Sequence, residues 1–191
     1  MTGDTRTRMI EATVSALQQR GIAGMSFTDV LRASGGARGA IYHHFPGGKA
    51  QIVAEAAAAN GRDVRAFLGA LPADSPQGVV AAFLAAVRPV VQASACGGGC
   101  AVAALTVRSG TEADEPLREV AASAFASWAD QLAGRLAATG LAAAEAADLA
   151  ALLITLLQGA HVMCRATGTL EPFDQAARMA SALCRGRYGG A

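Results

Sequence analysis

SFTDVLRASGGARGAIYHHFPGGK, residues 26–49, is the stretch that decides the fold. Ser26 and Asp29 form a capping pattern, which predicts that a short helix begins just after Ser26. Gly35 and Gly36 follow that helix, and glycine adopts the positive φ angles of a tight turn at little cost. The chain is therefore expected to reverse there and to enter a second short helix. Two short helices joined in this way form a helix-turn-helix.

The second short helix is predicted over residues 37–45. Its two large apolar side chains, Ile41 and Phe45, lie four residues apart, so one side of the helix is expected to dock on the rest of the domain. The opposite side is polar, aromatic and partly cationic, and it carries no carboxylate. Such a surface suits a polyanion better than it suits plain solvent.

The segment GARGAIYHHFPGGK, from Gly36 to Lys49, resembles the recognition helix and following turn of TetR-type transcriptional repressors. Members of that family typically carry G-(V/A)-(S/P)-(K/R)-G-(T/S)-(L/I)-Y-x-H-F here, and this chain departs from the pattern at Gly36, Ala37 and Ala40. The spelling FPGGK, together with GCAVAAL at 99–105, is similar to the LmrA/YxaF-like subgroup. The resemblance implies a DNA-binding repressor.

Eight residues are predicted to contact DNA. Four are expected to meet phosphates, two to read bases, one to permit close approach, and one, Ala40, to touch a thymine methyl group. The competing interpretations are an ordinary pair of core helices and, for the two histidines, a solvated surface. The predicted phosphate contacts are Thr28, Tyr42, His44 and Lys49, the base readers are Arg38 and His43, and the close approach is at Gly39.

Composition and charge point to an all-α protein with a basic N-terminal end. The chain is rich in alanine, only 5% of its residues are aromatic, and no alternating strand pattern is evident. Its net charge is +1, but residues 1–65 hold eight Lys or Arg against five Asp or Glu, and residues 66–191 hold eight against ten. We expect a helix-turn-helix DNA-binding domain at 1–50 and a C-terminal effector-binding and dimerisation domain at 51–191.

About nine helices are predicted in total. The first is expected to stop at Gly21, and a later one to kink or end near Arg88 because proline 89 removes a backbone donor. A helix at 49–71 should connect the DNA-binding domain to the second domain. Apart from the two short helices of the helix-turn-helix and the helix at 49–71, the predicted helices cover 5–20, 76–88, 101–108, 116–138, 143–167 and 172–187.

The helix predicted at 143–167 is apolar around nearly its whole circumference, so it must be covered on nearly all sides. A membrane span is the alternative, but Gln158, His161 and Arg165 interrupt the apolar run. A second copy of the chain would cover the remaining face, and the TetR resemblance implies a four-helix bundle that holds a two-fold homodimer on a near-palindromic operator. The predicted dimer residues are Leu149, Leu152, Leu156, Met163, Phe173, Ala177, Ala180 and Leu183.

The remaining inward-facing side chains predict a pocket for a small, largely hydrophobic effector. Filling this pocket would move the helix at 49–71 and change the spacing of the two DNA-binding heads, provided that the effector prefers one spacing. The predicted pocket residues are Phe83, Val87, Cys100, Leu105, Phe125, Trp128, Leu153, Leu157 and His161.

The four cysteines are irregularly spaced, which argues against a disulfide framework. A thiol-sensing or metal-sensing regulator that uses Cys96, Cys100 and Cys164 is an alternative function. A small Cys/His enzyme built on Cys164 and His161 is a remote one, because no acid accompanies the pair to orient it. We expect no catalytic residue, no metal and no cofactor. The N-terminus does not read as a signal peptide, which indicates a cytoplasmic protein.

Overall fold

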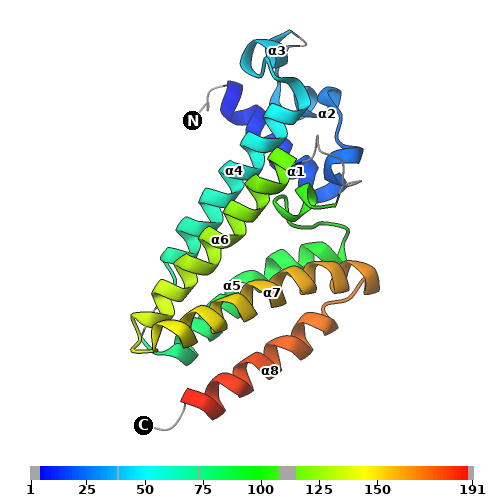
Figure 1. Ribbon diagram of the computed structural model, residues 1–191. Coiled ribbons are helices and arrows are strands. Elements are labelled where there is room, and N and C mark those ends of the chain that lie inside the picture. Colours follow the sequence, from blue (N-terminus) through cyan, green and yellow to red (C-terminus); the bar gives the residue numbers. More distant parts are fainter. Residues whose placement is uncertain (1–4, 38, 73, 108–114, 189–191) are drawn as a thin grey trace. The chain divides into compact units, whose positions relative to one another are not determined.

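The computed structural model of this chain describes residues 5–37, 39–72, 74–107 and 115–188. In these residues the chain forms eight α-helices and one short 3-10 helix, without a strand, which confirms the predicted all-α class (Figure 1). The elements are α1 (Thr5–Gly24), α2 (Phe27–Ser34), α3 (Ala40–His44), α4 (Gly48–Gly69), α5 (Pro76–Ala95), η1 (Ala103–Leu105), α6 (Glu115–Ala137), α7 (Ala143–Thr167) and α8 (Glu171–Tyr188).

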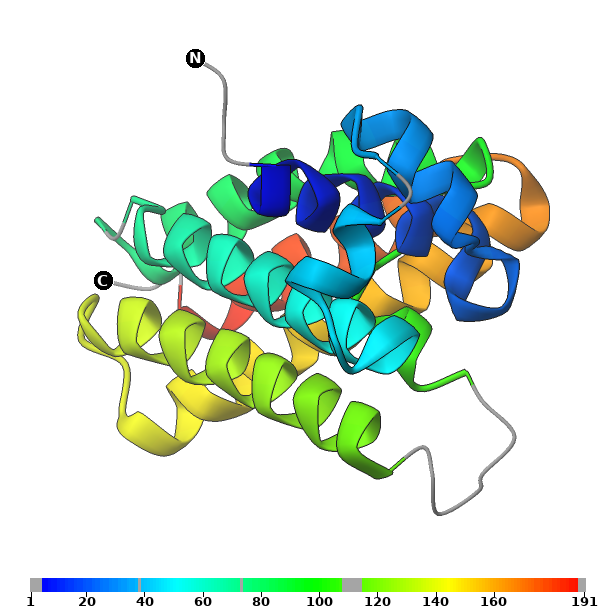
Figure 2. The ribbon, with the colours of Figure 1, turned by 90° about the horizontal axis from the view of Figure 1, so that it is seen from above.

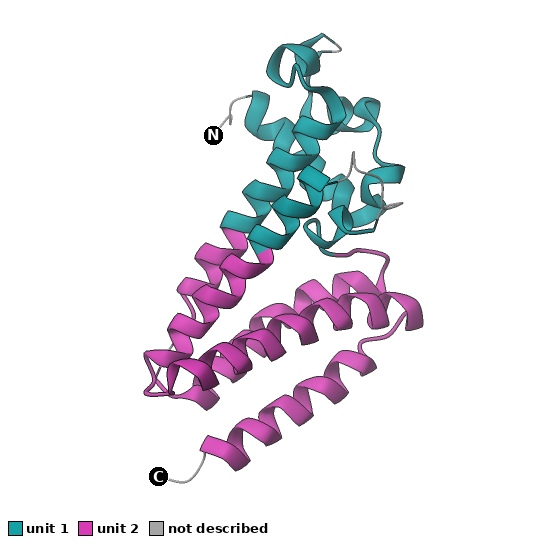
Figure 3. Cartoon of the chain, viewed as in Figure 1, with its two compact units in different colours: residues 1–62, 100–124 teal, residues 63–99, 125–191 magenta. Residues whose placement is uncertain are grey.

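The chain divides into two compact units (Figure 3). Unit 1 contains residues 1–62 and 100–124, and unit 2 contains residues 63–99 and 125–191. Helices α4 and α6 each contribute to both units, and the two helices run side by side in both views of the ribbon (Figures 1 and 2). The compact units thus differ from the predicted division at residue 50, because 100–124 groups with the helix-turn-helix.

Unit 1 is held together by apolar side chains that meet behind the helix-turn-helix. Helix α1 packs against α2 and against η1. The helical backbone of α1 breaks at Gly21, where φ is 64°, which is where the first helix was predicted to stop. The buried side chains of this core include Met9, Leu17, Met25, Val30, Ile41, Phe45, Ile52, Val53 and Leu105.

Unit 2 is built around α5, α7 and α8, each of which packs against the other two. Helix α7 has the bounds predicted from its apolar run, and it ends at a left-handed C-cap, Gly168. The side chains that fill this core repeat at helical spacing along all three helices. They include Phe83, Val87 and Val91 from α5, Leu153 and Leu157 from α7, and Phe173 from α8.

Two predicted helices differ most from the structure, besides α3, which is shorter than the predicted 37–45. Helix α5 neither ends nor breaks at Arg88, but continues through Pro89 to Ala95. Pro89 lies on the exposed side, and buried residues on both sides of it, Val87 and Val91, hold the helix on the core despite the lost hydrogen bond. The helix predicted at 101–108 is only the 3-10 turn η1 in the described residues, and residue 108 lies outside them.

Helices α5 and α7 are each long and apolar enough to cross a membrane by length and composition, although polar residues interrupt α7. In each helix, 39% of the most apolar window is already buried inside the chain. Core helices of water-soluble proteins pass the same test, because burial on several sides requires apolar residues on several sides. The packing of both helices against α8 is consistent with that explanation.

Candidate functional site

The start of α2 is fixed by a cap that also uses nearby charges. The Ser26 hydroxyl oxygen accepts the Asp29 N–H at 3.2 Å and donates its own proton to the Asp29 carboxylate at 2.8 Å. Arg20 and Arg32 lie 2.7 and 3.5 Å from the same carboxylate. The Ser26 hydrogen bond, supported by these two cations, lowers the pKa of Asp29. The cap therefore links α2 to α1 through Arg20.

The turn after α2 depends on two glycines for different reasons. Gly35 adopts φ of 68°, in the left-handed region, and its N–H bonds the Leu31 carbonyl oxygen. Gly36 is needed for close approach, because a Cβ at this position would lie 2.5 Å from the terminal methyl of the buried Met9. The turn thus closes directly against α1.

Helix α3 presents one side to the core and the other to solvent. Ile41 and Phe45 are fully buried, as their spacing predicted, whereas Tyr42 is 63% exposed and His43 is also exposed. The Tyr42 ring meets the edge of Phe27 from α2, with ring centroids 5.9 Å apart at 88°. This contact fixes the orientation of the exposed Tyr42 ring, which neighbours His43 in the chain.

A polar network ties the turn after α3 to α1 and α4. The Gly47 N–H donates to the Gln51 side-chain oxygen at 2.8 Å, and the Gln51 amide donates to Glu55 at 2.9 Å. Glu55 pairs with Arg6 from α1, whose guanidinium lies 5.1 Å from the Phe45 ring centroid. The network fixes the position of α3 through the residues at its C-terminal end.

Lys49 has a structural contact that the sequence did not reveal. Its ammonium donates to the Met25 carbonyl oxygen at 2.8 Å, which holds the start of α4 beside the start of α2. A lysine ammonium carries three donors, so two remain for another acceptor. The side chain is exposed, so its predicted contact with a phosphate remains compatible with this position.

The structure describes seven of the eight residues predicted to contact DNA, and Arg38 lies outside the described residues. The segment 35–49 contains no carboxylate. We call its exposed part, together with Thr28 of α2, the recognition surface. The exposed residues are Thr28, Gly39, Tyr42, His43 and Lys49, while Ala40 and His44 are half-buried.

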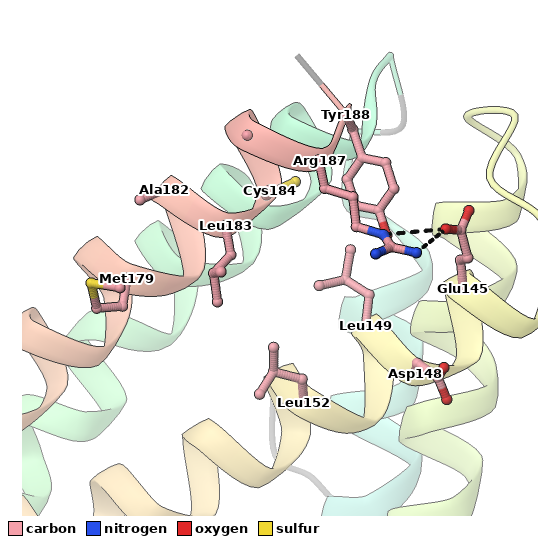
Figure 4. A pocket seen from close by; sticks show the side chains of 11 residues that line it. Glu145, Asp148, Leu149, Leu152, Met179, Ala182, Leu183, Cys184, Arg187 and Tyr188 are labelled. Atoms are coloured by element: carbon pink, nitrogen blue, oxygen red, sulfur yellow. Dashed lines mark hydrogen bonds and ion pairs between the residues drawn. The ribbon is translucent and has the colours of Figure 1, made fainter. Parts of the chain in front are cut away.

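A groove of about 820 Å³ lies between α7 and α8 in unit 2 (Figure 4). Three of the predicted dimer residues, Leu149, Leu152 and Leu183, line it. Near one end of the groove Arg187 donates to Glu145 at 2.6 Å. The groove is therefore mostly apolar, with a charged pair near the end of α8.

The side of α8 that faces the core differs from the prediction, as two residues show. Phe173 is 1% exposed and Ala180 is also buried, so both pack inside the chain and leave no surface for a partner. Their stripe faces α5 and α7, which turns Met179 and Leu183 outward. Periodicity groups residues on one side of a helix but does not say which of two apolar sides faces inward.

Apolar side chains on α7 and α8 form an outward-facing cluster, which we call the outer face. Leu152, Met163 and Leu183 were predicted there, and they are 45%, 54% and 60% exposed. Val162 and Met179 also belong to it. Neither of these last two was predicted from the sequence, because other residues of each helix were expected on the partner side.

The predicted effector-pocket residues fall into both units. Cys100 and Leu105 belong to unit 1, and the other seven belong to unit 2. None of the nine lines the α7–α8 groove or a second groove of about 610 Å³ between α5 and α8. Within unit 2, Phe125 and Trp128 meet edge to face with ring centroids 5.2 Å apart.

His161 is buried and hydrogen-bonded to Ser94, which was not among the predicted site residues. Its Nδ1 lies 2.6 Å from the Ser94 hydroxyl oxygen of α5, 67 positions earlier in the chain. Burial lowers the pKa of His161 to about 4, so the imidazole is neutral near pH 7. No local signal in the sequence pairs these residues, because only the packing of α5 on α7 brings them together.

The cysteines do not assemble into a metal site. Cys164 is buried, Cys96 is exposed, and the Cys100 sulfur accepts the Ala103 N–H at 3.4 Å. Among the residues that the structure describes, no three His, Cys, Asp or Glu side chains lie close enough together to hold a metal ion. The metal-sensing alternative therefore has no support in the geometry.

Two family models match the chain. The model for bacterial regulatory proteins of the tetR family matches residues 9–56, over the helix-turn-helix. The model for the C-terminal domain of LmrA/YxaF-like transcriptional regulators matches residues 76–179, which is more than half of the chain. This chain belongs to the TetR family. The predicted LmrA/YxaF-like subgroup is also confirmed.

Related proteins align in sequence with this TetR-family chain over most of its length. It is 32% identical over 173 residues to an uncharacterized HTH-type transcriptional regulator of Mycobacterium tuberculosis, covering 88% of each chain. It is 26% identical over 163 residues to the HTH-type transcriptional regulator LmrA of Bacillus subtilis, covering 82% of this chain and 84% of that one. The protein is thus a transcriptional regulator and not an enzyme, which rules out the Cys/His enzyme alternative.

Solved TetR-family structures share the fold. A TetR transcriptional regulator from Legionella pneumophila superposes with a TM-score of 0.79 at 17% identity, covering 95% of this chain and 98% of that one. The TetR-family regulator CifR, solved as a cysteine mutant with 26-bp double-strand operator DNA, gives a TM-score of 0.66 at 22% identity, covering 94% and 96%. These likenesses establish the arrangement of helices.

Proposed function

We propose that this regulator is a cytoplasmic, homodimeric repressor that binds a near-palindromic operator and releases it when a small, largely apolar effector binds. The observation that carries the proposal is the exposed side of α3. Tyr42 and His43 project from a helix whose opposite side is fully anchored by Ile41 and Phe45. A rigid, carboxylate-free surface of this kind suits insertion into a DNA groove.

In the proposed complex, phosphates bind around the edge of the recognition surface and bases are read at its centre. Tyr42 and Lys49, with Thr28 and His44, contact the backbone, whereas His43 and Arg38 reach base edges. CifR was solved with duplex operator DNA, and the shared fold is consistent with a similar use of α3 here. Ala40 lacks the hydroxyl typical of the family, so it offers a thymine methyl an apolar neighbour.

The proposed dimer forms through the outer face and the α7–α8 groove. Five apolar side chains are exposed on these two neighbouring helices, and an exposed apolar cluster of this kind is typical of an interaction surface. A two-fold dimer would place the same face on both copies and would set the two α3 helices about 34–36 Å apart, one turn of DNA. This geometry requires two half-sites in the operator.

The proposed effector site lies in unit 2, among the apolar side chains that α5 and α7 bury. Phe83, Leu153 and Leu157 supply apolar walls, and the neutral His161 supplies a polar group. Ligand pockets combine apolar walls with few polar groups in this way. An effector that prefers one dimer spacing would then shift the population of DNA-binding dimers.

Fluorescence anisotropy with duplex DNA from upstream of the regulator's own gene tests the DNA-binding proposal. We expect tight, salt-dependent binding to a segment with two similar half-sites, and weaker binding to a scrambled duplex of the same length and composition. Equal affinity for both duplexes would contradict the proposed operator recognition.

Light scattering on the purified protein tests the dimer. We expect the wild type to be dimeric and the double variant Leu152→Glu, Leu183→Glu to be monomeric, because the symmetric interface would bury two carboxylates from each copy, four in all. Val107→Glu is the matched control, since Val107 is 82% exposed and belongs to unit 1, whereas the outer face belongs to unit 2. A monomeric wild type would contradict the proposal.

A further inference from the structure

The side-chain amide of Gln158, on α7, is buried without a hydrogen-bond partner. Both the Nε2 and the Oε1 atoms are shielded from solvent, and neither has a hydrogen-bond partner in the structure. Buried polar groups in folded proteins nearly always have partners, because an unpaired donor or acceptor forfeits its hydrogen bonds with water. An amide left in this state calls for an explanation.

The other buried unpaired atoms have a simpler explanation. They are the Nε atoms of Arg8 and Arg135. Each of these guanidinium groups is engaged through a second nitrogen, since Arg8 donates to Thr5 and Arg135 donates to the Leu71 carbonyl oxygen. Gln158 has no second contact of this kind, so among these three side chains it is the one whose whole polar group lacks a partner.

Gln158 sits beside the other buried polar group on α7. His161 follows it by three residues, so both side chains lie along the same side of the helix. The His161 Nδ1 is occupied by Ser94 at 2.6 Å, and its Nε2 is a donor or an acceptor according to the tautomer. Together, the amide and the imidazole offer a ligand both hydrogen-bond donors and acceptors.

The helix segments that carry this pair and Ser94 hold few charged side chains. Residues 149–162 of α7 include no Asp, Glu, Lys or Arg. On α5, the helix that supplies Ser94, Arg88 is exposed and pairs with Asp174 of α8 at 3.1 Å. A charged ligand group beside this pair would therefore find no unpaired opposite charge on these segments, and burying a charge without a partner is strongly unfavourable. The pair is suited to an uncharged polar group.

We propose that Gln158 is the hydrogen-bonding anchor of the effector site, and that it selects an uncharged, otherwise apolar molecule that carries a donor beside an acceptor, as a primary amide or a lactam does. The Gln158 carboxamide itself carries a donor beside an acceptor, so such a ligand satisfies both atoms at once. A ligand with an acceptor alone satisfies only one of them. This inference rests on the proposed effector response and specifies the chemistry of the ligand.

A matched set of octyl and octanoyl compounds tests this selectivity. Octanamide, octanoate, octylammonium and methyl octanoate share an apolar chain and differ only in the polar end. Isothermal titration and the fluorescence of Trp128, the single tryptophan of the chain, report binding. We expect octanamide to bind at least about 10-fold more tightly than each of the other three, because a site that hydrogen-bonds its ligand discriminates against analogues that leave its polar groups unpaired.

Replacing the amide gives an independent readout without any ligand. In Gln158→Leu the orphaned polar atoms are gone, so we expect the thermal midpoint of the ligand-free protein to rise by roughly 3–6 °C and the preference for octanamide to disappear. Gln158→Met repeats the change with an unbranched side chain. Gln92→Leu is the matched control, since Gln92 is exposed on α5 and its replacement is expected to change neither readout.

Each outcome decides the inference. An unchanged or lowered midpoint in both Gln158 variants, equal binding of octanoate and octanamide, or no binding of any of the four compounds would overturn the role of Gln158. Operator binding is measured in parallel on the wild type and on Gln158→Leu. If both bind the operator while the amide preference is absent, only this inference fails; if neither binds DNA, the proposed function itself fails.

Discussion

The recognition surface and helix α7 carry their functional side chains in opposite ways. The residues of the recognition surface fall within 28–49, and most of them point outward from α2 and α3, which are only eight and five residues long. Helix α7 runs for 25 residues, and its important side chains point both inward, as His161 does, and outward, as Leu152 does. A surface that meets DNA can be displayed locally, whereas a pocket or a dimer interface is completed by distant parts of the chain.

Removing the exposed aromatic and imidazole groups of α3 gives the largest expected effect. In the double variant Tyr42→Ala, His43→Ala, we expect operator affinity to fall by about 100-fold or more, because a phosphate contact and a base contact are both lost. Anisotropy with the operator duplex measures the change. The thermal midpoint is expected to stay close to that of the wild type, since Tyr42 is mostly exposed.

Val107→Ala serves as the control for this double variant, because Val107 is an exposed unit 1 residue outside the recognition surface. An affinity within about threefold of the wild type in the double variant would mean that DNA contacts lie elsewhere.

Titration of His161 gives the next largest effect. It concerns a buried residue of unit 2, in contrast to the exposed residues of the recognition surface. Its pKa is lowered from 6.5 to about 4 in the folded chain, so the unfolded chain binds the proton more readily at intermediate pH. Stability is therefore full above about pH 6.5 and falls as the pH drops toward 4. We expect this residue alone to cost about 2 kcal/mol between pH 7 and pH 5.

Urea unfolding at pH 7 and pH 5 measures this loss. The pH dependence should become shallower in His161→Gln and persist in His43→Asn, because His43 is exposed on α3. Identical pH dependence in the wild type and His161→Gln would show that burial of the imidazole is not the cause.

The turn between α2 and α3 is expected to give a smaller effect. In Gly36→Ala, the new methyl group would displace the end of the flexible Met9 side chain in the core, at a cost of about 1 kcal/mol. Gly39→Ala is the matched control, since a Cβ there meets nothing within 4 Å and its φ is −75°. If both substitutions changed the urea midpoint equally, the contact between Gly36 and Met9 would not be tight.

A surface ion pair gives the smallest expected effect. Arg88 and Asp174 join α5 to α8 at 3.1 Å, but the Arg88 side chain is 48% exposed. We expect Arg88→Ala to lower the free energy of unfolding by less than about 1 kcal/mol, and the difference to shrink in high salt. Urea unfolding at low and high salt measures it, and a loss of several kcal/mol would indicate that the pair is a major link between these helices.

Much of the helix-turn-helix could be predicted because its sequence signals are local. A cap at Ser26, positive-φ glycine at Gly35 and anchors at Ile41 and Phe45 act within a few residues of each other, and the structure contains all of them. The hydrogen bond from Lys49 to Met25 could not be predicted in the same way. It joins residues 24 positions apart, and nothing in either residue's own neighbourhood requires it.

In unit 2, the sequence alone determined the length of α7 and the need to cover that helix on several sides. Both follow from the spacing of apolar residues and from a terminal glycine, which are properties of the sequence itself. Only the tertiary structure decided which apolar residues of α8 turn inward, as Phe173 does, and which turn outward, as Met179 does. It also decided that Ser94 meets His161 while the amide of Gln158 meets no partner. The physical reason is that a helix without a clearly polar side has no rotation fixed by its own sequence, so its orientation is set by the helices that pack against it.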